Sequence, residues 1–187
     1  MFEQLHTPED IFSFKLGSAL SMEHDVEKIL ADLEEHAQRP ELKTMFREQA
    51  AVTRQQAANI EQSFALLGEK VDDSPSPVTK GLAAEGKAAI RKTDDAIVDA
   101  VILAGALEAA HYQIAVYEVL VTNAHARGAA DVAALLGQNL AQEEAAKDAI
   151  KAVATRISTE GIAYHPTSTP GAAHTAPAAV ADPTAAR

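Results

Sequence analysis

Cysteine is absent from this 187-residue chain. Its absence excludes disulfide bonds, thiolate metal sites and cysteine nucleophiles, so any metal site would have to use histidine and carboxylate side chains. It also suits a reducing compartment, and we expect a soluble, cytoplasmic protein. The N-terminus has no basic segment followed by an apolar one, and we expect no later stretch to be long and apolar enough to span a bilayer.

Tryptophan is also absent, aromatic residues make up only 4% of the chain, and alanine is abundant. This composition favours long α-helices over sheets, which are rich in β-branched and aromatic residues. The chain has 16 basic against 27 acidic residues and a formal net charge of -11. Without a broad basic surface, nucleic acids and membranes are disfavoured as partners. The length fits one domain with one core.

Residues 7–10, Thr-Pro-Glu-Asp, are typical of a helix start. The threonine hydroxyl can cap, proline suits the first helical position, and the carboxylates lie near the positive end of the helix dipole. We predict a first helix from residue 8 to about residue 39, because the residue before Pro40 resists the helical conformation. Its predicted core face is Phe12, Leu16, Ala19, Glu23, Val26, Leu30 and Leu33.

A second helix is predicted from Pro40 to Gly68, where glycine provides a helix stop. Its core face reads Leu42, Met45 or Phe46, Gln49, Val52 or Thr53, Gln56, Ile60, Phe64 and Leu67. The segment 71–78 is rich in aspartate and proline and is predicted to be a loop. A short connecting helix over residues 80–91 then crosses the bundle, as ferritin-like topologies allow.

A third helix is predicted from a cap near Thr93 to a stop at Gly128, and a fourth covers residues 132–158. The core face of the third is predicted to be Ile97, Ala100 or Val101, Ala104, Leu107, His111, Ile114, Glu118 and Val121. That of the fourth is Val132, Leu136, Asn139, Glu143, Ala146, Ile150, Val153 and Ile157.

We therefore predict an all-α protein, a ferritin-like antiparallel four-helix bundle over residues 1–158 with a short connecting helix. Residues 159–187 are rich in Ala, Pro and Thr and show no apolar periodicity that could bury a face. They are predicted to form a disordered C-terminal tail.

Each of the four long helices places a polar residue near the middle of its predicted core face. These are Glu23 on the first, Gln49 and Gln56 on the second, His111 on the third and Glu143 on the fourth. Burying a lone carboxylate costs several kcal/mol or forces it to keep its proton. Such groups at one level therefore imply mutual pairing, buried water or a cation.

Glu108 and His111 are three residues apart, which is the spacing of Glu-x-x-His metal pairs in ferritin-like bundles. Two interpretations stay open. Glu108 and His111 could bind metal together with Glu23 and Glu143, or Glu108 could lie in solvent while His111 is a hydrogen-bonded core histidine. Of the adjacent Glu143 and Glu144, we expect one to point inward and one outward.

Several segments resemble a known family when taken in order. They are Glu9-Asp10-Ile11-Phe12, Ser21-Met22-Glu23, Leu66-Leu67-Gly68, Gly81-Leu82-Ala83-Ala84-Glu85, and His111-Tyr112 with Tyr117. Their order and spacing, over residues 8–157, resemble the YciE/YciF ferritin-like proteins. The resemblance implies an antiparallel bundle that forms a dimer, in bacterial proteins linked with stress responses. It also implies a potential di-metal centre between the helices.

The chain keeps only part of the family's metal pattern. Positions that agree are Glu23, Thr53, Gln56, His111 and Glu143. Where the family has His-Leu-x-Glu-Thr, residues 49–53 read Gln-Ala-Ala-Val-Thr, and Ala110 and Gln113 flank His111-Tyr112 where the family has Glu. Lys147 stands where the family has an acidic residue. Since two divalent ions need several carboxylates, a standard two-metal site is predicted to be dismantled.

Two functions follow from these observations, and they leave open whether the protein is an enzyme. The first is a non-catalytic, stress-associated protein that acts through a homodimer surface or an unidentified protein partner and keeps a metal-free polar cluster for packing. The second is an oxidase or peroxide-handling protein that uses one iron or manganese ion held by Glu23, Glu108, His111 and Glu143. We accordingly expect either no cofactor or a single divalent metal.

Overall fold

This computed structural model describes residues 4–165 of the chain. They contain five α-helices and one short 3-10 helix, joined by loops. The long helices are α1 (Pro8–His36), α2 (Pro40–Leu67), α4 (Val98–Ala126) and α5 (Ala130–Glu160). In the sequence, the shorter α3 (Pro77–Arg91) and the 3-10 helix η1 (Asp95–Ile97) lie between α2 and α4. No strand occurs in this part of the chain.

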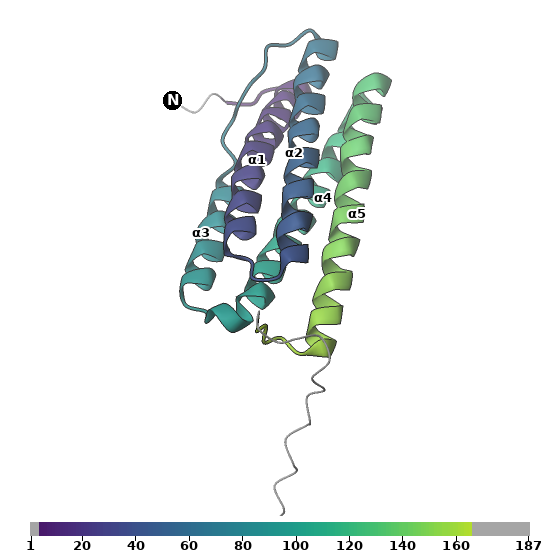
Figure 1. Cartoon of the computed structure of the whole chain (residues 1–187). Helices are drawn as coiled ribbons and strands as arrows, with labels where there is room; N and C mark the ends of the chain where they lie inside the picture. Colours follow the sequence, from purple (N-terminus) through teal and green to yellow (C-terminus); the bar gives the residue numbers. More distant parts are fainter. Residues whose placement is uncertain (1–3, 166–187) are drawn as a thin grey trace, which may run out of the picture.

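Two helical hairpins form the bundle. Helix α1 packs on α2 and α4 packs on α5, while α1 also contacts α4 and α2 contacts α5. The neighbours run antiparallel, and α3 lies outside this set of four, against α1 and α4 (Figure 1). The predicted all-α, antiparallel four-helix bundle with a connecting helix is therefore confirmed.

The helix ends follow from local chemistry. At the start of α1 the Thr7 hydroxyl accepts a bond of 3.0 Å from the Asp10 amide, and the Thr7 amide donates to the Asp10 carboxylate at 2.9 Å. This capping box satisfies amides that have no partner inside the helix. Gly68 and Gly128 end α2 and α4 with φ of 71°, a left-handed conformation that glycine adopts without strain.

The core lies between the four long helices. All seven residues predicted for the face of the first helix are buried in α1, and the faces of α2 and α5 also follow the predicted spacing. The prediction for the third helix is wrong. The residues that α4 buries are Val98, Asp99, Ile102, Leu103, Ala106, Ala109, Ala110, Gln113, Tyr117, Leu120 and Ala124.

The expectation that no stretch is long and apolar enough to cross a membrane is wrong for the segment that contains α4. Asp95–Ala126 passes that test by length and composition, with a mean hydropathy of 1.3 over its best window. The same test is passed by core helices of soluble proteins. In this structure α4 packs against α1, α3 and α5, which is the position of a core helix.

The loop between α2 and α3 crosses directly over Gly17 of α1. The Ser21 hydroxyl donates to the Asp73 carbonyl at 3.0 Å, and the Ser13 hydroxyl donates to the Glu69 carboxylate at 2.6 Å. A Cβ at Gly17 would lie 3.0 Å from the backbone oxygen of Asp72 and 2.8 Å from its carboxylate. The crossing therefore requires glycine at this position.

Gly17→Ala should lower the free energy of unfolding by about 1–3 kcal/mol, because the loop must shift to make room for the methyl group. Chemical denaturation measures the change. Gly105→Ala is the matched control: that position is helical and has nothing within 4 Å of an added Cβ. It should be neutral or stabilising by up to about 1 kcal/mol. An equal loss in both variants would contradict this role of Gly17.

A buried ion pair closes the end of the bundle where α1 turns into α2. The Arg39 guanidinium lies 2.8 Å from Asp99, which also accepts the backbone amides of Gln38 and Arg39. Arg39 further contacts the Gly161 and Ile162 carbonyls at 3.4 Å, and its guanidinium lies 4.8 Å from the centre of the Tyr164 ring. We call these contacts the Arg39 clasp.

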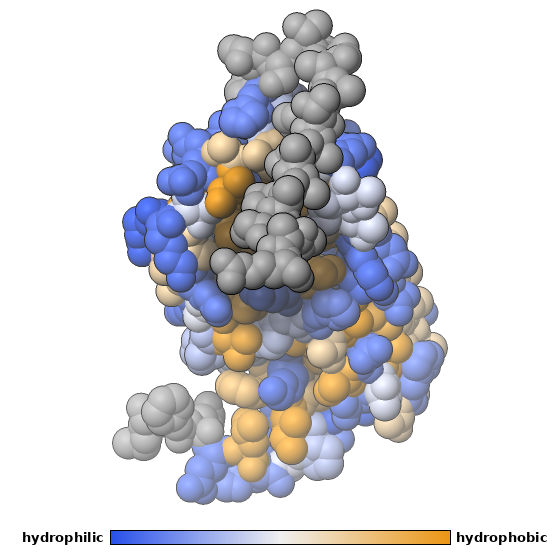
Figure 2. Space-filling view, turned by 90° about the horizontal axis from the view of Figure 1, so that it is seen from below, coloured by the Kyte–Doolittle hydropathy of each residue, from blue (hydrophilic) through white to orange (hydrophobic). Residues whose placement is uncertain are grey.

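The Arg39 clasp holds the residues that follow α5 against the end of the bundle. Helix α5 extends to Glu160, two residues past the predicted boundary at residue 158. Residues 161–165 then lie against the same end of the bundle, where hydrophilic residues surround smaller apolar areas (Figure 2). The remainder of the predicted tail, residues 166–187, lies outside the described residues.

Candidate functional site

Polar side chains from all four long helices meet inside the bundle. We call this set the buried polar network: Glu23 of α1, Gln49, Gln56 and Asn59 of α2, Gln113 and Tyr117 of α4, and Asn139 and Glu143 of α5. All are buried except Gln49, which is half-buried. The α-helical spacing places Asn139 and Glu143, and likewise Gln113 and Tyr117, one turn apart on the same helix face.

At one end of the network, two residues of α4 bind the Glu23 carboxyl. The Tyr117 hydroxyl donates to Oε1 at 2.6 Å. The Gln113 side-chain amide lies 3.2 Å from Oε1 and 3.0 Å from Oε2. The NH2 group of Gln113 is the donor in both contacts. Glu23 itself is fully buried and has no cationic side chain among these partners.

At the other end, two residues of α2 bind Glu143. The Gln56 amide donates to Oε1 at 2.7 Å, and the Gln49 amide donates to the same oxygen at 3.1 Å. Glu143 is 1% exposed, whereas the adjacent Glu144 is exposed, which confirms that one of the two points inward and one outward.

Asn139 joins the two ends. Its NH2 group donates to the Tyr117 hydroxyl at 3.0 Å and to the Gln56 backbone carbonyl at 3.1 Å, and its oxygen accepts from the Asn59 amide at 2.7 Å. A path of hydrogen-bonded groups therefore runs from Glu23 through Tyr117, Asn139 and Gln56 to Glu143. These hydrogen bonds between helices restrict how the four helices can shift against one another, although the side-chain oxygen of Gln56 has no partner within residues 4–165.

Burial controls the protonation of the network. Desolvation raises the pKa of Glu23 to about 8, against the smaller opposing effect of its bond from Tyr117, and the charge of Glu143 raises it further. Desolvation likewise raises the pKa of Glu143 to about 7. Burial, followed by the negative charge of Glu23, raises the pKa of Tyr117 well above its ordinary value. Near neutral pH, Glu23 therefore keeps its proton and Tyr117 stays a phenol.

The structure does not bring the four predicted metal ligands together. Glu23 and Glu143 lie in the buried polar network, but Glu108 and His111 are exposed on the outer face of α4. The expectation that His111 faces the core is therefore wrong, and the interpretation of Glu108 as a solvated side chain is the correct one. Among residues 4–165, no three His, Cys, Asp or Glu side chains are grouped so that they could hold a metal ion.

The donor set of the network does not fit a di-metal centre. Only two carboxyls are present, and amide or phenol hydrogens already point at both oxygens of Glu23 and at Oε1 of Glu143. A metal ion needs those lone pairs free and needs several ionised ligands for charge balance. A cavity of about 20 Å³ beside Gln113 and Glu143 has room for roughly one water molecule.

The sequence interpretation missed Asn59, Gln113 and Tyr117 as network members. Gln113 and Tyr117 are four residues apart and continue the buried row Ala106–Ala109–Ala110, which is a usable signal in hindsight. It was obscured because apolar residues occur all around α4, so that several faces of the helix look equally suited to the core.

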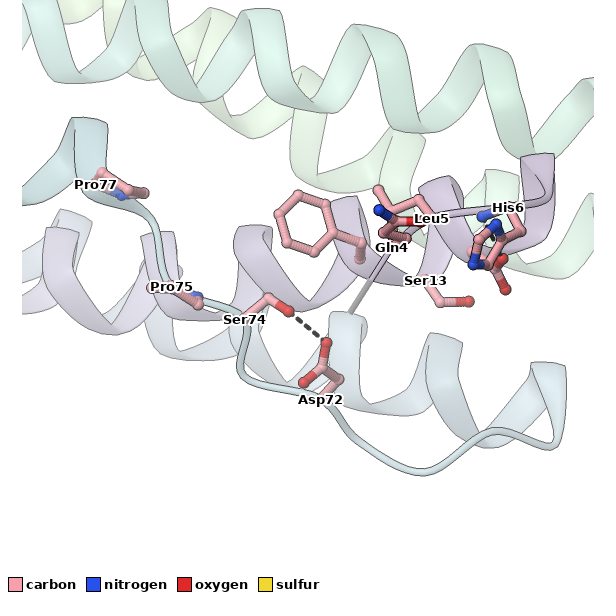
Figure 3. A pocket seen from close by; sticks show the side chains of 10 residues that line it. Gln4, Leu5, His6, Ser13, Asp72, Ser74, Pro75 and Pro77 are labelled. Atoms are coloured by element: carbon pink, nitrogen blue, oxygen red, sulfur yellow. Dashed lines mark hydrogen bonds between the residues drawn. The ribbon is translucent and has the colours of Figure 1, made fainter. Parts of the chain in front are cut away.

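A second depression lies outside the bundle core, and four of the six polar side chains that line it, Asp10, Ser13, Asp72 and Ser74, have hydrogen-bond partners. This groove of about 810 Å³ lies between the first half of α1 and the loop after α2, and Leu5, Phe14 and Pro75 line it (Figure 3). The Ser74 hydroxyl donates to Asp72 at 2.6 Å, and Asp10 serves the helix cap. No set of free polar groups converges there, so the buried polar network is the stronger candidate site.

Comparisons with known proteins agree with this architecture. A family model described as "Domain of unknown function (DUF892)" matches residues 7–163. Protein YciF of Escherichia coli strain K12 is 29% identical over 143 residues, which cover 75% of this chain and 86% of YciF. The crystal structure of the E. coli stress protein YciF has a TM-score of 0.80 at 27% identity and covers 84% of this chain and 100% of that one. YcfI from Rhodopseudomonas palustris has a TM-score of 0.77 at 28% identity, with coverage of 81% and 97%.

Proposed function

Since this chain belongs to the YciF-type DUF892 family, we propose that it is a non-catalytic, stress-associated protein in which a metal-free hydrogen-bonded network occupies the centre of the bundle. The stress association is suggested by the description of the E. coli relative as a stress protein. On this proposal the protein acts in the cytoplasm through its outer surface, as a homodimer or with another protein.

One observation carries the proposal: glutamine side chains bind both buried carboxyls. Gln113 donates to Glu23, and Gln49 and Gln56 donate to Glu143. A carboxylate ligand offers a lone pair to a metal, whereas here N–H groups point at those lone pairs. The amides thus provide hydrogen bonds where a metal ion would provide positive charge. Because hydrogen bonds alone do not offset the burial of a negative charge, the carboxyls keep a proton.

The oxidase alternative is disfavoured by the same geometry. It requires Glu108 and His111 to join Glu23 and Glu143 around one ion, and both α4 residues are exposed. Oxygen and nitrogen ligands lie about 2 Å from a transition-metal ion. Bringing the two side chains inward would require α4 to rotate about its axis and expose Gln113 and Tyr117, which now bind Glu23.

Elemental analysis tests the proposal. The protein is expressed with iron and manganese supplied and purified without chelator, alongside the Glu23→Gln, Glu143→Gln double variant. We expect far less than one equivalent of metal per chain in both proteins, because neither offers the required donors. Near-stoichiometric metal that is lost in the double variant would overturn the proposal.

Light scattering on the same sample tests the homodimer. The expected mass is about twice the 19.7 kDa of the chain. A measured mass equal to that of a single chain would rule out the homodimer and leave only action through another protein.

A further inference from the structure

The groove of about 810 Å³ beside α1 has an apolar lining that solvent can reach. The segment before α1 and the loop from Asp72 to Pro77 both line it (Figure 3). Its apolar side chains come from Leu5, Phe14, Pro75 and Pro77. Leu5 is 44% exposed and Phe14 is 37% exposed, so both are available to a partner.

Exposed apolar side chains are concentrated around this groove. Among the described residues, nine large apolar side chains are exposed. Five of them line the groove or directly adjoin a lining residue in the sequence, and these are Leu5, Ile11, Phe14, Val71 and Val78. The two segments that form the groove, residues 4–17 and 68–78, are only a small part of the chain. Because soluble proteins rarely gather exposed apolar side chains without a use for them, this surface is a candidate docking site.

Hydrogen bonds hold the walls of the groove in place. The Thr7 capping box fixes the segment that leads into α1. The Ser13 and Ser21 hydroxyls bind the loop after α2 to α1, at 2.6 Å and 3.0 Å from their acceptors. A surface that is already ordered loses less entropy when a partner binds than a mobile one does.

The groove carries negative charge. Asp10 and Asp72 line it, and Glu69 accepts the hydroxyl of the lining Ser13. Within residues 4–165 these three carboxylates form no ion pair and are bound only by amides and hydroxyls. Hydrogen bonds from backbone amides, that of His6 first, hold the pKa of Asp10 below its ordinary value. No Lys or Arg lines the groove, and His6 is positive only when protonated. The two segments together have five acidic against two basic residues.

We propose that this groove docks a protein segment in which an apolar side chain stands next to lysine or arginine. The apolar side chain packs on Leu5 and Phe14, and the cation lies near Asp10 or Asp72. A nucleic acid or another anionic partner would be repelled by the same carboxylates. This inference rests on the proposed action through the outer surface, and it adds the surface and the chemistry of the partner.

Amide NMR with defined peptides tests the proposal. We expect acetyl-Lys-Leu-Phe-Lys-amide to give saturable shifts at residues 10–14 and 72–74, with Kd in the millimolar range that suits a ligand with so few contacts. Acetyl-Glu-Leu-Phe-Glu-amide should bind about tenfold more weakly, because its charges are repelled. Acetyl-Lys-Ser-Ser-Lys-amide should also bind about tenfold more weakly, because it lacks the apolar side chains.

Variants of the groove complete the test. Phe14→Ser should weaken binding of the Lys-Leu-Phe-Lys peptide about tenfold, since it removes an exposed apolar contact. Asp72→Asn should weaken it about threefold, because asparagine keeps an acceptor for Ser74 and loses the charge. The matched control is Ile97→Ser, which removes an exposed apolar side chain outside the groove and should leave binding unchanged.

Equal binding of the acidic peptide, or unchanged binding in both groove variants, would overturn the proposal. So would light scattering that shows a dimer in the unmodified protein and a single chain in Phe14→Ser, because the groove would then be filled by a second copy. These outcomes leave the metal-free network unaffected, since elemental analysis tests that part of the proposed function separately.

Discussion

The free energy of unfolding should fall as pH rises from about 5 to about 9, and the fall should be largest between the unfolded and folded pKa values of Glu23. In that range the folded protein holds a proton on Glu23 that the unfolded chain has released, so rising pH favours unfolding. The pKa rises from 4.5 to about 8 on folding. At about 1.4 kcal/mol per pKa unit, this amounts to roughly 5 kcal/mol.

Glu143 contributes in the same direction. Its pKa rises from 4.5 to about 7, so its share of stability is present below pH 4.5 and lost by about pH 7. The two carboxyls interact through their charges, and their effects should not simply add. Urea denaturation across the pH range measures the sum.

Glu23→Gln is the matched variant for this prediction, because glutamine has the shape of a protonated glutamate and cannot ionise. Its stability should depend less on pH, with the contribution of Glu143 remaining, and should exceed that of the unmodified protein at about pH 9. Glu144→Gln, an exposed neighbour on α5, should leave the pH dependence unchanged. Stability that rises with pH in the unmodified protein, as expected for carboxylates paired with cations, would contradict the account.

Asp99→Ala should lower the free energy of unfolding by about 3–5 kcal/mol, because it leaves the Arg39 charge buried without its partner. Arg39 is 7% exposed and Asp99 is 1% exposed. The variant also removes the acceptor for the Gln38 and Arg39 amides in the α1–α2 turn. For a chain of this length the melting temperature should fall by roughly 2–4 °C per kcal/mol.

An exposed ion pair provides the control for Asp99→Ala. Glu34→Ala breaks the pair with Arg47, whose side chains are 29% and 66% exposed. Such pairs contribute about 0–1 kcal/mol, so this variant should be nearly neutral. Thermal unfolding of both variants measures the difference. A similar loss of stability in the two variants would contradict the prediction that the buried Arg39–Asp99 pair stabilises the protein more than the exposed pair does.

The sequence was informative where a helix is apolar on one face only. The core faces of α1, α2 and α5 were predicted because polar residues cover their other sides, so the spacing of apolar residues identifies one face. Glu23 and Glu143 stood out as exceptions within those faces, and both are network members. The helix ends could also be predicted, because the residues that determine them, such as Thr7 and Gly68, act within one turn of the helix end.

The rest of the site could not be predicted because it depends on the rotation of α4. Apolar residues on every side of that helix allow several rotations with similar burial. The Glu108–His111 spacing then favoured a face that lies in solvent. Partners such as Tyr117 and Asn139 also come from different helices, and their pairing depends on helix packing rather than on any local pattern.

Carbon-13 NMR of the glutamate carboxyl groups, with Glu23 assigned through Glu23→Gln, tests the central claim most directly. We expect Glu23 to titrate near its folded pKa of about 8, as a buried carboxyl bound by Gln113 and Tyr117 without a cation. A Glu23 carboxylate that stays ionised from about pH 5 upward would contradict it, because that behaviour requires a metal ion or another positive charge at the centre of the bundle.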